Sequence, residues 1–390
     1  MANPMLVTPL RTARTLTLAL EGRLDITSAP VLGRALVLDD TDTLVLDLAG
    51  CDYVSSAGLR EILTAYKRMA GAGGEMRVVN VCRDVQHVLE ITGLSSMLQV
   101  RPKLREISLD GLEFLSAGVC GECFRLDRET IVKVYKDGID PGIAEQEKRF
   151  AKAAFVLGIP TAISYDVVAC GSRTGVVYEM LDAELFSRVI ARTPDDLEPH
   201  ARTLAEVLRA IHETKGDPAV FPDLKARFRE YVAQMDFFLP AEDVALLQAR
   251  LEALPDADTC VHFDLHTSNI MIRDGEPVII DMGDLSIGSP LFDVGLLCTI
   301  YGLPEFGVCE MATKLPDPLG ERLLARTLDL YFAGRPPAER ELFERNRWFL
   351  ASLRLIYSIT FLPAMRDRFV VWIRDGLMPR IRAEAAGAGA

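Results

Sequence analysis

The sequence lacks any apolar run long enough to cross a membrane, and its first residues lack a basic segment followed by an apolar core. We therefore expect no membrane span and no signal peptide. The 8 cysteines have no spacing typical of a disulfide framework, and the 5 histidines form no zinc-type cluster with them. Scattered thiols of this kind are typical of a reducing compartment, which predicts a cytoplasmic location.

The sequence also has fewer basic than acidic residues: 43 Lys and Arg residues compared with 56 Asp and Glu residues, which gives a formal net charge of −13. A chain of this sign repels polyanions, so no nucleic-acid partner is expected. An acidic cleft would suit a cationic acceptor, although the net charge of a chain is weak evidence about any one cleft. A length of 390 residues allows two or three domains.

What the sequence does contain is a polar motif at residues 262–269, followed by a short apolar segment that ends at Asp281. This order of two aspartates and an asparagine suits a site that holds Mg·ATP and an acceptor hydroxyl in line. Asp264 is placed to take the hydroxyl proton, and Asn269 and Asp281 are placed to hold Mg²⁺ against the phosphates. A polar surface loop is the alternative, but it does not explain the strand ends that flank a tight hairpin turn at 273–276.

A phosphate-binding segment is expected upstream of this motif. Gly118 and Gly121 lie between two predicted strands, where glycines let backbone N–H groups approach phosphates closely. Lys133 stands inside an apolar strand, where a charge is costly unless it is paired. It is predicted to contact the α and β phosphates, and the alternative is an edge-strand lysine that points to water. The helix predicted over 144–155 offers two partners for it, Glu145 and the preferred Glu147.

The strand predicted over 176–181 would be the hinge between two lobes in a kinase fold. Its backbone around Glu179 to Leu181 would then hydrogen-bond the adenine ring of the nucleotide. An ordinary core strand would have the same sequence pattern, so the residues alone leave both interpretations open.

From about Ile107 to Met378, the chain resembles the aminoglycoside phosphotransferase/choline kinase-like family. The residues that carry the resemblance fit the catalytic-loop pattern His-x-Asp-x-His-x-x-Asn, and here they are His262, Asp264, His266 and Asn269. The resemblance implies an α+β bilobal protein-kinase-like domain at 107–380, with an N-lobe at 107–181 and a C-lobe at 182–380. It also implies ATP and Mg²⁺ as cofactors and a hydroxyl-bearing acceptor.

Some positions depart from that family or from ordinary protein kinases. Phe263 stands where glycine is common, and residues 267–268 replace a common proline and glycine, but neither change removes a catalytic group. Pro290 follows Asp281 too soon for a long activation segment, and no Ala-Pro-Glu motif follows. These absences argue against an ordinary protein kinase.

Several other polar residues near the motif have more than one interpretation. His212, His262 and Asp293 are expected to support the catalytic loop from behind. His266 either touches substrate or buttresses Asp264. Asp284 is expected to cap a helix, and a role next to the metal ligands is the alternative.

The first hundred residues have their own pattern of short strands alternating with helices, which predicts an α/β domain at 1–104 with a mixed or parallel sheet. Residues 21–25 and 46–60 resemble the STAS domain, the fold of anti-sigma-factor antagonists. In family members that act as switches, a serine at a helix entry is phosphorylated, and alignment on Gly58 and Leu59 makes this serine Ser56. A phosphate there would be stabilised by the helix N-terminus, whereas the alternative is that Ser55 and Ser56 only cap the helix.

The last third of the chain is expected to be helical over 319–332, 337–360 and 363–377, with a flexible tail at 381–390. Trp348, Tyr357 and Trp372 are expected to pack in the core, although they could line a pocket. Cys120 and Cys123 fall in the predicted phosphate loop, where redox gating of ATP binding is a less favoured hypothesis.

Taken together, the residues predict an ATP- and Mg²⁺-dependent O-phosphotransferase that acts on a hydroxyl acceptor, with a STAS domain that regulates it or docks a protein partner. A small-molecule acceptor is favoured. One alternative is a protein-directed kinase in a partner-switching circuit, which would phosphorylate Ser56 or a STAS serine of another chain. A second alternative is an ATP-sensing scaffold without transfer activity.

Overall fold

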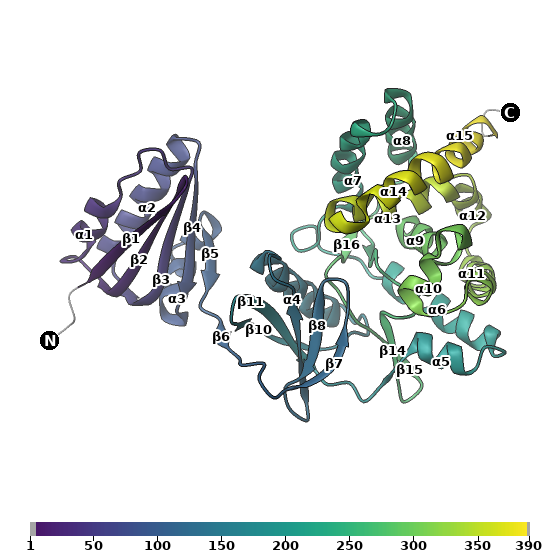
Figure 1. Ribbon diagram of the computed structural model, residues 1–390, viewed down its shortest axis with the longest axis horizontal. Helices are drawn as coiled ribbons and strands as arrows, with labels where there is room; N and C mark the ends of the chain where they lie inside the picture. The colour runs from purple at the N-terminus through teal and green to yellow at the C-terminus, as the bar shows by residue number, and fades with distance from the viewer. Residues whose placement is uncertain (1–4, 388–390) are drawn as a thin grey trace. The chain divides into compact units, whose positions relative to one another are not determined.

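The computed structural model describes residues 5–387, and the chain separates into two compact units, Met1–Glu106 and Ile107–Ala390 (Figure 1). Each unit has its own secondary structure and its own buried residues. The units are described in turn, because each can be understood from its own contacts.

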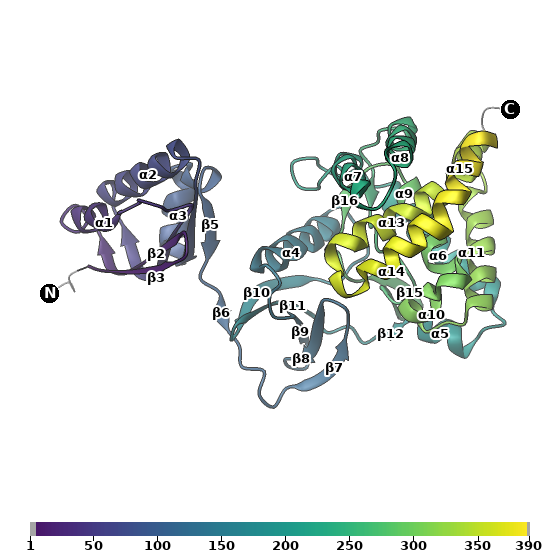
Figure 2. The same ribbon diagram turned by 45° about the horizontal axis from the view of Figure 1, so that its top comes forward.

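The first unit is a five-stranded sheet in the order β1-β2-β3-β4-β5, with helices packed on it (Figures 1 and 2). The β1 strand pairs with β2 in antiparallel fashion, and the other neighbours are parallel. The sheet is therefore mixed, which is one of the two arrangements that the sequence left open. The strands are β1 Leu6–Thr12, β2 Thr15–Leu24, β3 Thr43–Val54, β4 Glu75–Val81 and β5 Gln99–Pro102, and the helices are α1 Ala29–Ala35, α2 Ser56–Gly71, α3 Arg83–Ile91 and the short 3₁₀ helix η1 Leu94–Ser96.

The core of this unit follows from alternation along its strands. Every second residue of β2 from Leu16 to Leu20, and of β3 from Leu44 to Leu48, is buried. The α2 helix begins after Ser55, whose side chain accepts a hydrogen bond from the N–H of Gly58. A Cβ atom at Gly58 would lie 2.7 Å from the carbonyl oxygen of Leu24, so glycine lets α2 approach the sheet closely.

The second unit begins with a sheet whose strands lie in the order β10-β11-β9-β8-β7, and helix α4 packs against it. Two smaller sheets follow, β12-β14-β15 and β13-β16. Asp274 and Gly275 both have positive φ and form a two-residue turn between β14 and β15, which confirms the predicted hairpin. The short strand β6 Arg105–Glu106 ends the first unit. The strands of the second unit are β7 Glu113–Ala117, β8 Gly121–Arg125, β9 Thr130–Tyr135, β10 Ser164–Cys170, β11 Arg173–Glu179, β12 Glu184–Leu185, β13 Cys260–Val261, β14 Ile270–Arg273, β15 Glu276–Ile279 and β16 Ser286–Ile287.

Helices make up most of the remainder of this unit (Figure 2). The α9 helix is buried along its whole length and packs on α13. The α-helices are α4 Pro141–Val156, α5 Phe186–Arg192, α6 Leu197–His212, α7 Leu224–Ala233, α8 Ala241–Ala253, α9 Leu291–Tyr301, α10 Val308–Thr313, α11 Asp317–Phe332, α12 Pro337–Glu344, α13 Arg347–Phe361, α14 Arg366–Val371 and α15 Met378–Gly387. Short 3₁₀ helices are η2 Gln234–Phe237, η3 Pro304–Phe306 and η4 Pro363–Met365, and the π-helical turn η5 spans Trp372–Leu377.

Two predictions about the C-terminal third were wrong. The helix expected over 337–360 is two helices, because the chain breaks between α12 and α13 at Asn346, which is buried and whose side-chain NH₂ donates to the carbonyl of Leu342. The tail expected from residue 381 is helical as far as Gly387, and the last residues, 388–390, lie outside the described part. Ile381 is fully buried and Arg382 forms an ion pair with Asp243, so packing and charge hold α15 in place.

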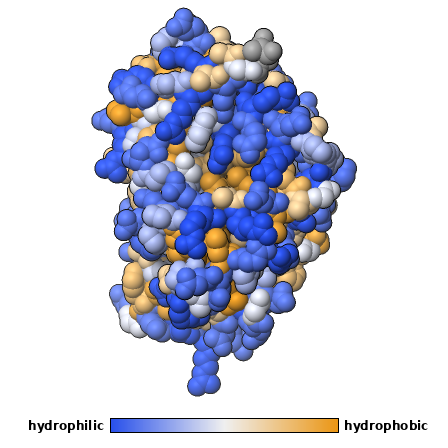
Figure 3. All heavy atoms as spheres, turned by 90° about the vertical axis from the view of Figure 1, so that its right-hand side faces the viewer, coloured by the Kyte–Doolittle hydropathy of each residue, from blue (hydrophilic) through white to orange (hydrophobic). Residues whose placement is uncertain are grey.

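Within residues 5–387, no single helix is long and apolar enough to cross a membrane, although one bent pair, residues 347–361 with 363–387, meets the test of length and composition at a bend of 120°. Figure 3 shows the face formed by the C-terminal helices, where hydrophilic residues predominate and hydrophobic ones form separate groups.

Candidate active site

Lys133 and Glu147 form a buried ion pair at the centre of the site. The β8–β9 register places Lys133 inside the sheet, and its Nζ lies 3.0 Å from both carboxylate oxygens of Glu147 on α4. The same Nζ lies 2.8 Å from Oδ1 of Asp281. Glu147, and not Glu145, is therefore the helix partner of this lysine. The pair explains how a lysine is accommodated in an apolar strand.

Two tyrosines fix the position of the Glu147 carboxylate, which is only 2% exposed. The hydroxyl of Tyr178 donates to Oε1 at 2.5 Å, and the hydroxyl of Tyr135 donates to Oε2. A buried carboxylate is costly unless its oxygens are satisfied, and here the lysine and both tyrosines satisfy them. Sequence reasoning missed both tyrosines, because tyrosine in a strand is ordinary by composition.

The glycine segment joins β7 to β8 beside this lysine. The N–H of Gly118 donates to the carbonyl of Gly121 at 2.8 Å. A Cβ atom at Gly121 would lie 2.5 Å from the carbonyl oxygen of Val134, so only glycine fits there, whereas Gly118 has open space around it. The two glycines therefore differ, since Gly121 is required for strand pairing and Gly118 is not sterically constrained.

The predicted hinge lies at the end of β11. The N–H of Glu179 donates to the carbonyl of Ile163, and the N–H of Met180 donates to the carbonyl of Glu129. These two N–H groups are thus used inside the protein. A contact to adenine would fall to the carbonyl of Glu179 and to the backbone of Leu181.

The catalytic-loop residues converge as their spacing predicted. The side-chain NH₂ of Asn269 donates to the carbonyl of Asp264 at 2.8 Å and to its Oδ2 at 3.2 Å. The N–H of Ile280, next to Asp281, donates to the carbonyl of Asn269 at 2.9 Å. Asp264, Asn269 and Asp281 are therefore held together, on the side of the site where Lys133 lies.

Asp293 orients this loop from beneath. Its carboxylate is fully buried and accepts hydrogen bonds from the N–H groups of His262 and Phe263 at 2.9 and 2.6 Å. Nε2 of His212 lies 3.1 Å from the same carboxylate. These contacts place Asp293, His212 and His262 behind the loop, as the sequence predicted. Nδ1 of His266 accepts from the N–H of Ser268 at 3.2 Å, so this histidine stabilises the loop turn.

Arg354 is a site residue that sequence reasoning missed. It comes from α13, and its guanidinium lies 2.7 Å from Oδ1 of Asp264, 2.9 Å from Oδ2 of Asp284 and 2.8 Å from the carbonyl of Phe263. A lone arginine in the apolar segment 348–359 was the available signal, of the same kind that pointed to Lys133.

The expectation that Asp284 caps a helix was wrong. The next helix, α9, begins only at Leu291 and has Pro290 at its N-cap. The carboxylate of Asp284 instead accepts from Arg354 and from the hydroxyl of Tyr357. Tyr357 is thus a site residue as well as part of the core, whereas Trp372 stacks on Phe306 at 4.7 Å.

Burial and charge set the protonation of these groups in different directions. Burial raises the pKa of Asp264 above its ordinary value, although the charge of Arg354 opposes the rise. Burial alone would also raise the pKa of Asp281, but the charge and hydrogen bond of Lys133 outweigh it and leave that pKa lowered. Burial lowers the pKa of His266, which favours a neutral imidazole. One aspartate is thus tuned towards accepting a proton and the other towards remaining ionised.

The residues present fit a magnesium ion that is shared with a nucleotide. The side-chain nitrogen of Asn269 donates to Asp264, so the amide oxygen of Asn269 points away from that carboxylate. The Asp281 side chain is bonded to Lys133 through Oδ1 and remains 42% exposed. No group of three His, Cys, Asp or Glu side chains suited to a metal occurs within residues 5–387. Mg²⁺ commonly takes one or two protein oxygens together with water and substrate phosphates, so a two-residue set is sufficient.

Other predicted residues lie outside this cluster or show no special chemistry. Cys120 and Cys123 are free thiols, and burial raises the pKa of both, which disfavours the reactive thiolate. Ser56 is exposed in the first turn of α2, in the first unit.

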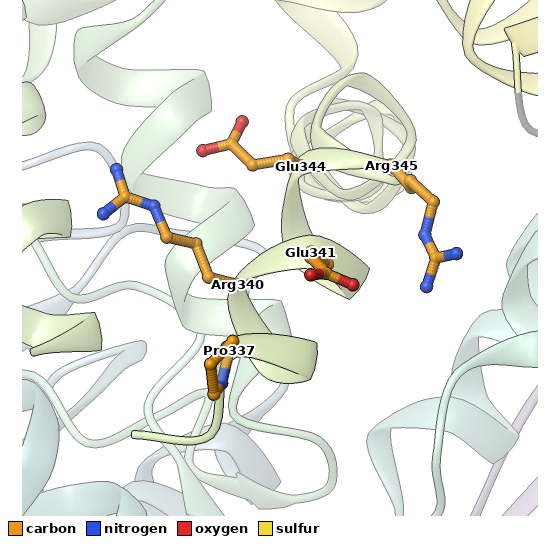
Figure 4. A pocket seen from close by; sticks show the side chains of 5 residues that line it. All are labelled: Pro337, Arg340, Glu341, Glu344 and Arg345. Carbon is orange, nitrogen blue, oxygen red and sulfur yellow. The ribbon is translucent and has the colours of Figure 1, made fainter. Parts of the chain in front are cut away.

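A hollow on the surface of α12 is distinct from this cluster. Figure 4 shows its lining, which comes from α12 and the residue after it and includes none of the predicted site residues. Arg340 is paired with Asp329, and Glu344 is paired with Arg347, so these charges are used within the protein.

Comparison with known proteins gives two family matches. Residues 7–107 match the STAS domain, and residues 114–342 match the family described as "Phosphotransferase enzyme family". A relative in Bordetella bronchiseptica, BtrV, is described as a candidate anti-sigma factor antagonist and is 40% identical over 57 residues. That match covers 15% of this chain and 49% of the relative, so the chain spans about half of it.

The chain also resembles several solved structures at low sequence identity. A choline/ethanolamine kinase family protein from Mesorhizobium loti is 19% identical with a TM-score of 0.45, covering 71% of this chain and 88% of that one. The ADP-bound aminoglycoside phosphotransferase APH(2'')-Ib is 18% identical with a TM-score of 0.44, covering 72% and 95%. Plasmodium vivax ethanolamine kinase is 14% identical with a TM-score of 0.48, covering 70% and 85%.

The phosphotransferase match covers more than half of the chain and contains Lys133, Glu147 and the whole catalytic loop. Residues 347–387, which include Arg354, lie beyond it. The chain therefore belongs to the phosphotransferase enzyme family, and it carries a STAS domain ahead of its kinase-like domain.

Proposed function

We propose that this protein transfers the γ-phosphoryl group of ATP to a hydroxyl group of a small-molecule acceptor, with Mg²⁺ as cofactor. The observation that supports the proposal is the convergence of Lys133, Glu147 and Asp281 with Asp264 and Asn269. These residues would supply an ammonium group for the phosphates, two metal ligands and a proton acceptor, and their contacts connect them in one set. Catalysis would rest on positioning and electrostatics.

Each residue has a distinct part in the proposed mechanism. Lys133 would hold the α and β phosphates under the glycine segment, with Glu147 keeping its ammonium group in place. Asn269 and Asp281 would hold Mg²⁺, which when bound offsets the charge of the phosphates. Asp264 would orient the acceptor hydroxyl and take its proton. The oxygen of that hydroxyl forms the new bond to phosphorus, while the bond from phosphorus to the β–γ bridging oxygen breaks and ADP leaves.

The proposal is tested by Asp264→Asn, which keeps the shape of the side chain and removes its basicity. We expect transfer to fall by about 100-fold or more, as loss of a general base does, while the Kd for Mg·ATP stays within about twofold. Calorimetry and a transfer assay measure the two quantities. Undiminished transfer by this variant would refute the mechanism.

A second candidate is phosphorylation of a STAS serine. Ser56 is exposed at the first position of the 16-residue helix α2, where free N–H groups and the helix dipole favour a phosphate. The match to the STAS domain, and the similarity to a candidate anti-sigma factor antagonist, also favour phosphorylation of a STAS serine. Intact-mass spectrometry after incubation with Mg·ATP decides it, because a phosphate on Ser56 that is absent from Asp264→Asn supports a protein-directed kinase.

A further inference from the structure

One carboxylate oxygen of Asp264 lies against a guanidinium group. Its Oδ2 is bonded to Asn269, on the metal side, and its Oδ1 is paired with Arg354 at 2.7 Å. A hydroxyl that delivers its proton to Asp264 must therefore approach beside Arg354. The side chains of Arg354 and Asp264 are 17% and 23% exposed, so this region is open to a ligand.

A second guanidinium lies next to the first. Arg227 of α7 and Arg354 both lie over the ring of Tyr357, with guanidinium carbons 5.6 and 5.2 Å from its centroid. Arg227 also lies 6.0 Å from the ring of Tyr231 and donates to the Tyr231 hydroxyl at 3.3 Å. The two arginines and the two tyrosines thus form one connected cluster, which reaches Asp264 through Arg354.

The two arginines differ in how their charge is compensated. Arg354 is paired with both Asp264 and Asp284. Arg227 is half-buried, and across residues 5–387 no carboxylate lies within ion-pair distance of it. Burial disfavours the Arg227 charge, but the hydrogen bond with Tyr231 and the nearby charge of Asp284 leave its pKa raised, so the side chain stays a cation with which an anionic group could pair.

A cationic acceptor would find no complementary group in this cluster. Asp264 and Asp284 already accept from Arg354, and Asp284 also accepts from Tyr357. A guanidinium, by contrast, presents a planar set of donors that fits a carboxylate or a phosphate. The overall charge of −13 therefore does not describe the local charge next to Asp264.

We propose that the acceptor carries an anionic group, a carboxylate or a phosphate ester, beside its hydroxyl, and that Arg227 binds this group. The inference rests on the proposed function and specifies its substrate class. Arg354 acts as a positioning residue: it holds Asp264 in place, and the acceptor hydroxyl approaches Asp264 beside it. Transfer then yields ADP and a phosphate ester of a hydroxy acid or of a phosphorylated polyol.

The test compares acceptors that share one carbon skeleton and differ in charge. Glycerate and glycerol 3-phosphate are anionic, glycerol is neutral, and 3-amino-1,2-propanediol is cationic; glucose 6-phosphate, glucose and glucosamine form a larger set. Transfer from Mg·ATP is measured with the full chain by mass spectrometry. We expect kcat/KM to be at least about tenfold higher for the anionic members, and the two anionic arms distinguish a carboxylate from a phosphate.

Arg227→Gln should remove this preference by raising KM for the anionic acceptor about 10- to 100-fold while changing kcat little. The matched control is Arg229→Gln, on the same helix, because Arg229 is exposed and paired with Glu252 at 2.6 and 2.9 Å. The control should behave as wild type. Equal use of all charge classes, a preference for the cationic compounds, or an unchanged KM in Arg227→Gln would overturn the inference.

Binding separates this inference from the proposed function. Calorimetry with Mg²⁺ and a non-hydrolysable ATP analogue first establishes whether nucleotide binds, and the anionic compounds are then titrated into that complex. Failure to bind the analogue contradicts the proposed function itself. Binding of the analogue without binding of any anionic compound overturns the anionic acceptor alone.

Discussion

At the scale of single residues, charge pairing explains most of the site. Two cations pair with aspartates of the site. Lys133 contacts the carboxylates of Glu147 and Asp281, and Arg354 contacts those of Asp264 and Asp284. Phe263 shows a different constraint, because its φ of +57° is a conformation that favours glycine, yet its side chain is buried against Phe228 and Tyr357. Aromatic packing thus offsets the backbone strain at this position.

The pH dependence of transfer should follow from the pairing of Asp264 with Arg354. Asp264 must be ionised to accept a proton, so kcat/KM should fall as pH drops through its raised pKa. Arg354→Met removes a positive charge that favours the carboxylate, so the acidic limb should move to higher pH. Arg354→Lys keeps the charge and should move the limb less. Profiles of kcat/KM against pH for the three proteins measure this, and coincident limbs would contradict it.

At the scale of elements, the position of the site depends on how strands and helices approach one another. The β8–β9 pairing aims Lys133 at α4, and the Oε1 and Oε2 atoms of Glu147 reach it from that helix. The carbonyl of Gly283, just after Asp281, accepts from the side chain of Gln146, so α4 is also tied to the metal side of the site. A small shift of β8 or α4 would therefore disturb nucleotide binding.

The two glycines of the phosphate segment should respond differently to alanine. In Gly121→Ala the new Cβ would clash with the carbonyl of Val134 at 2.5 Å, so β8 and β9 must separate, at a cost of about 1–3 kcal/mol. We expect a lower Tm and a Kd for Mg·ATP raised about tenfold. Gly118→Ala meets nothing closer than 3.9 Å and serves as the control, with near wild-type Tm. Equal Tm values for the two variants would argue against this packing.

The stability of α15 should depend on pH through Glu384, whose carboxylate accepts from the N–H of Trp348. Burial raises its pKa to about 7. The folded state therefore binds a proton that the unfolded state releases between an ordinary glutamate pKa and about 7, so stability falls as pH rises through this range. Glu384→Gln removes the charge, and it should raise Tm at pH 8 and leave it near wild type at pH 5. Parallel Tm profiles would contradict this assignment.

At the scale of the whole molecule, two units with separate cores share one chain. The first unit buries a cluster that includes Leu18, Leu46 and Ile62, and the second has its own clusters, one of which includes Val132 and Val168. The residues proposed to bind the nucleotide and metal, Lys133, Glu147, Asp264, Asn269 and Asp281, all belong to the second unit.

Each unit should therefore fold when it is expressed alone. We expect a fragment of residues 107–390 to bind Mg·ATP with a Kd within about threefold of that of the full chain, since the binding residues are retained. A fragment of residues 1–106 should unfold cooperatively by itself. Calorimetry and circular dichroism measure both properties, and an unfolded 107–390 fragment would show that the first unit is needed for folding.

Neighbouring residues were enough to predict the local features of this protein. Alternation of apolar residues predicted strands such as 15–20 and 43–48, the turn residues 274–275 predicted a hairpin, and the spacing of Asp264, Asn269 and Asp281 predicted their convergence. These features depend on residues close together in the chain, or on a motif whose spacing already reflects its fold. The role of each site residue stays a prediction that the experiments above address.

The contacts between distant segments could not be predicted in this way, because they arise from tertiary packing. The sequence favoured Glu147 but left Glu145 open, and the packing of α4 on the sheet settled the choice, because helix rotation sets which carboxylate faces Lys133. Arg354 lies 90 residues after Asp264 in sequence, and its pairing with that residue arises from the packing of α13 beside the loop. The break at Asn346 and the burial of Ile381 likewise depend on surrounding helices. Long-range packing, and not local propensity, therefore fixed the acceptor side of the site.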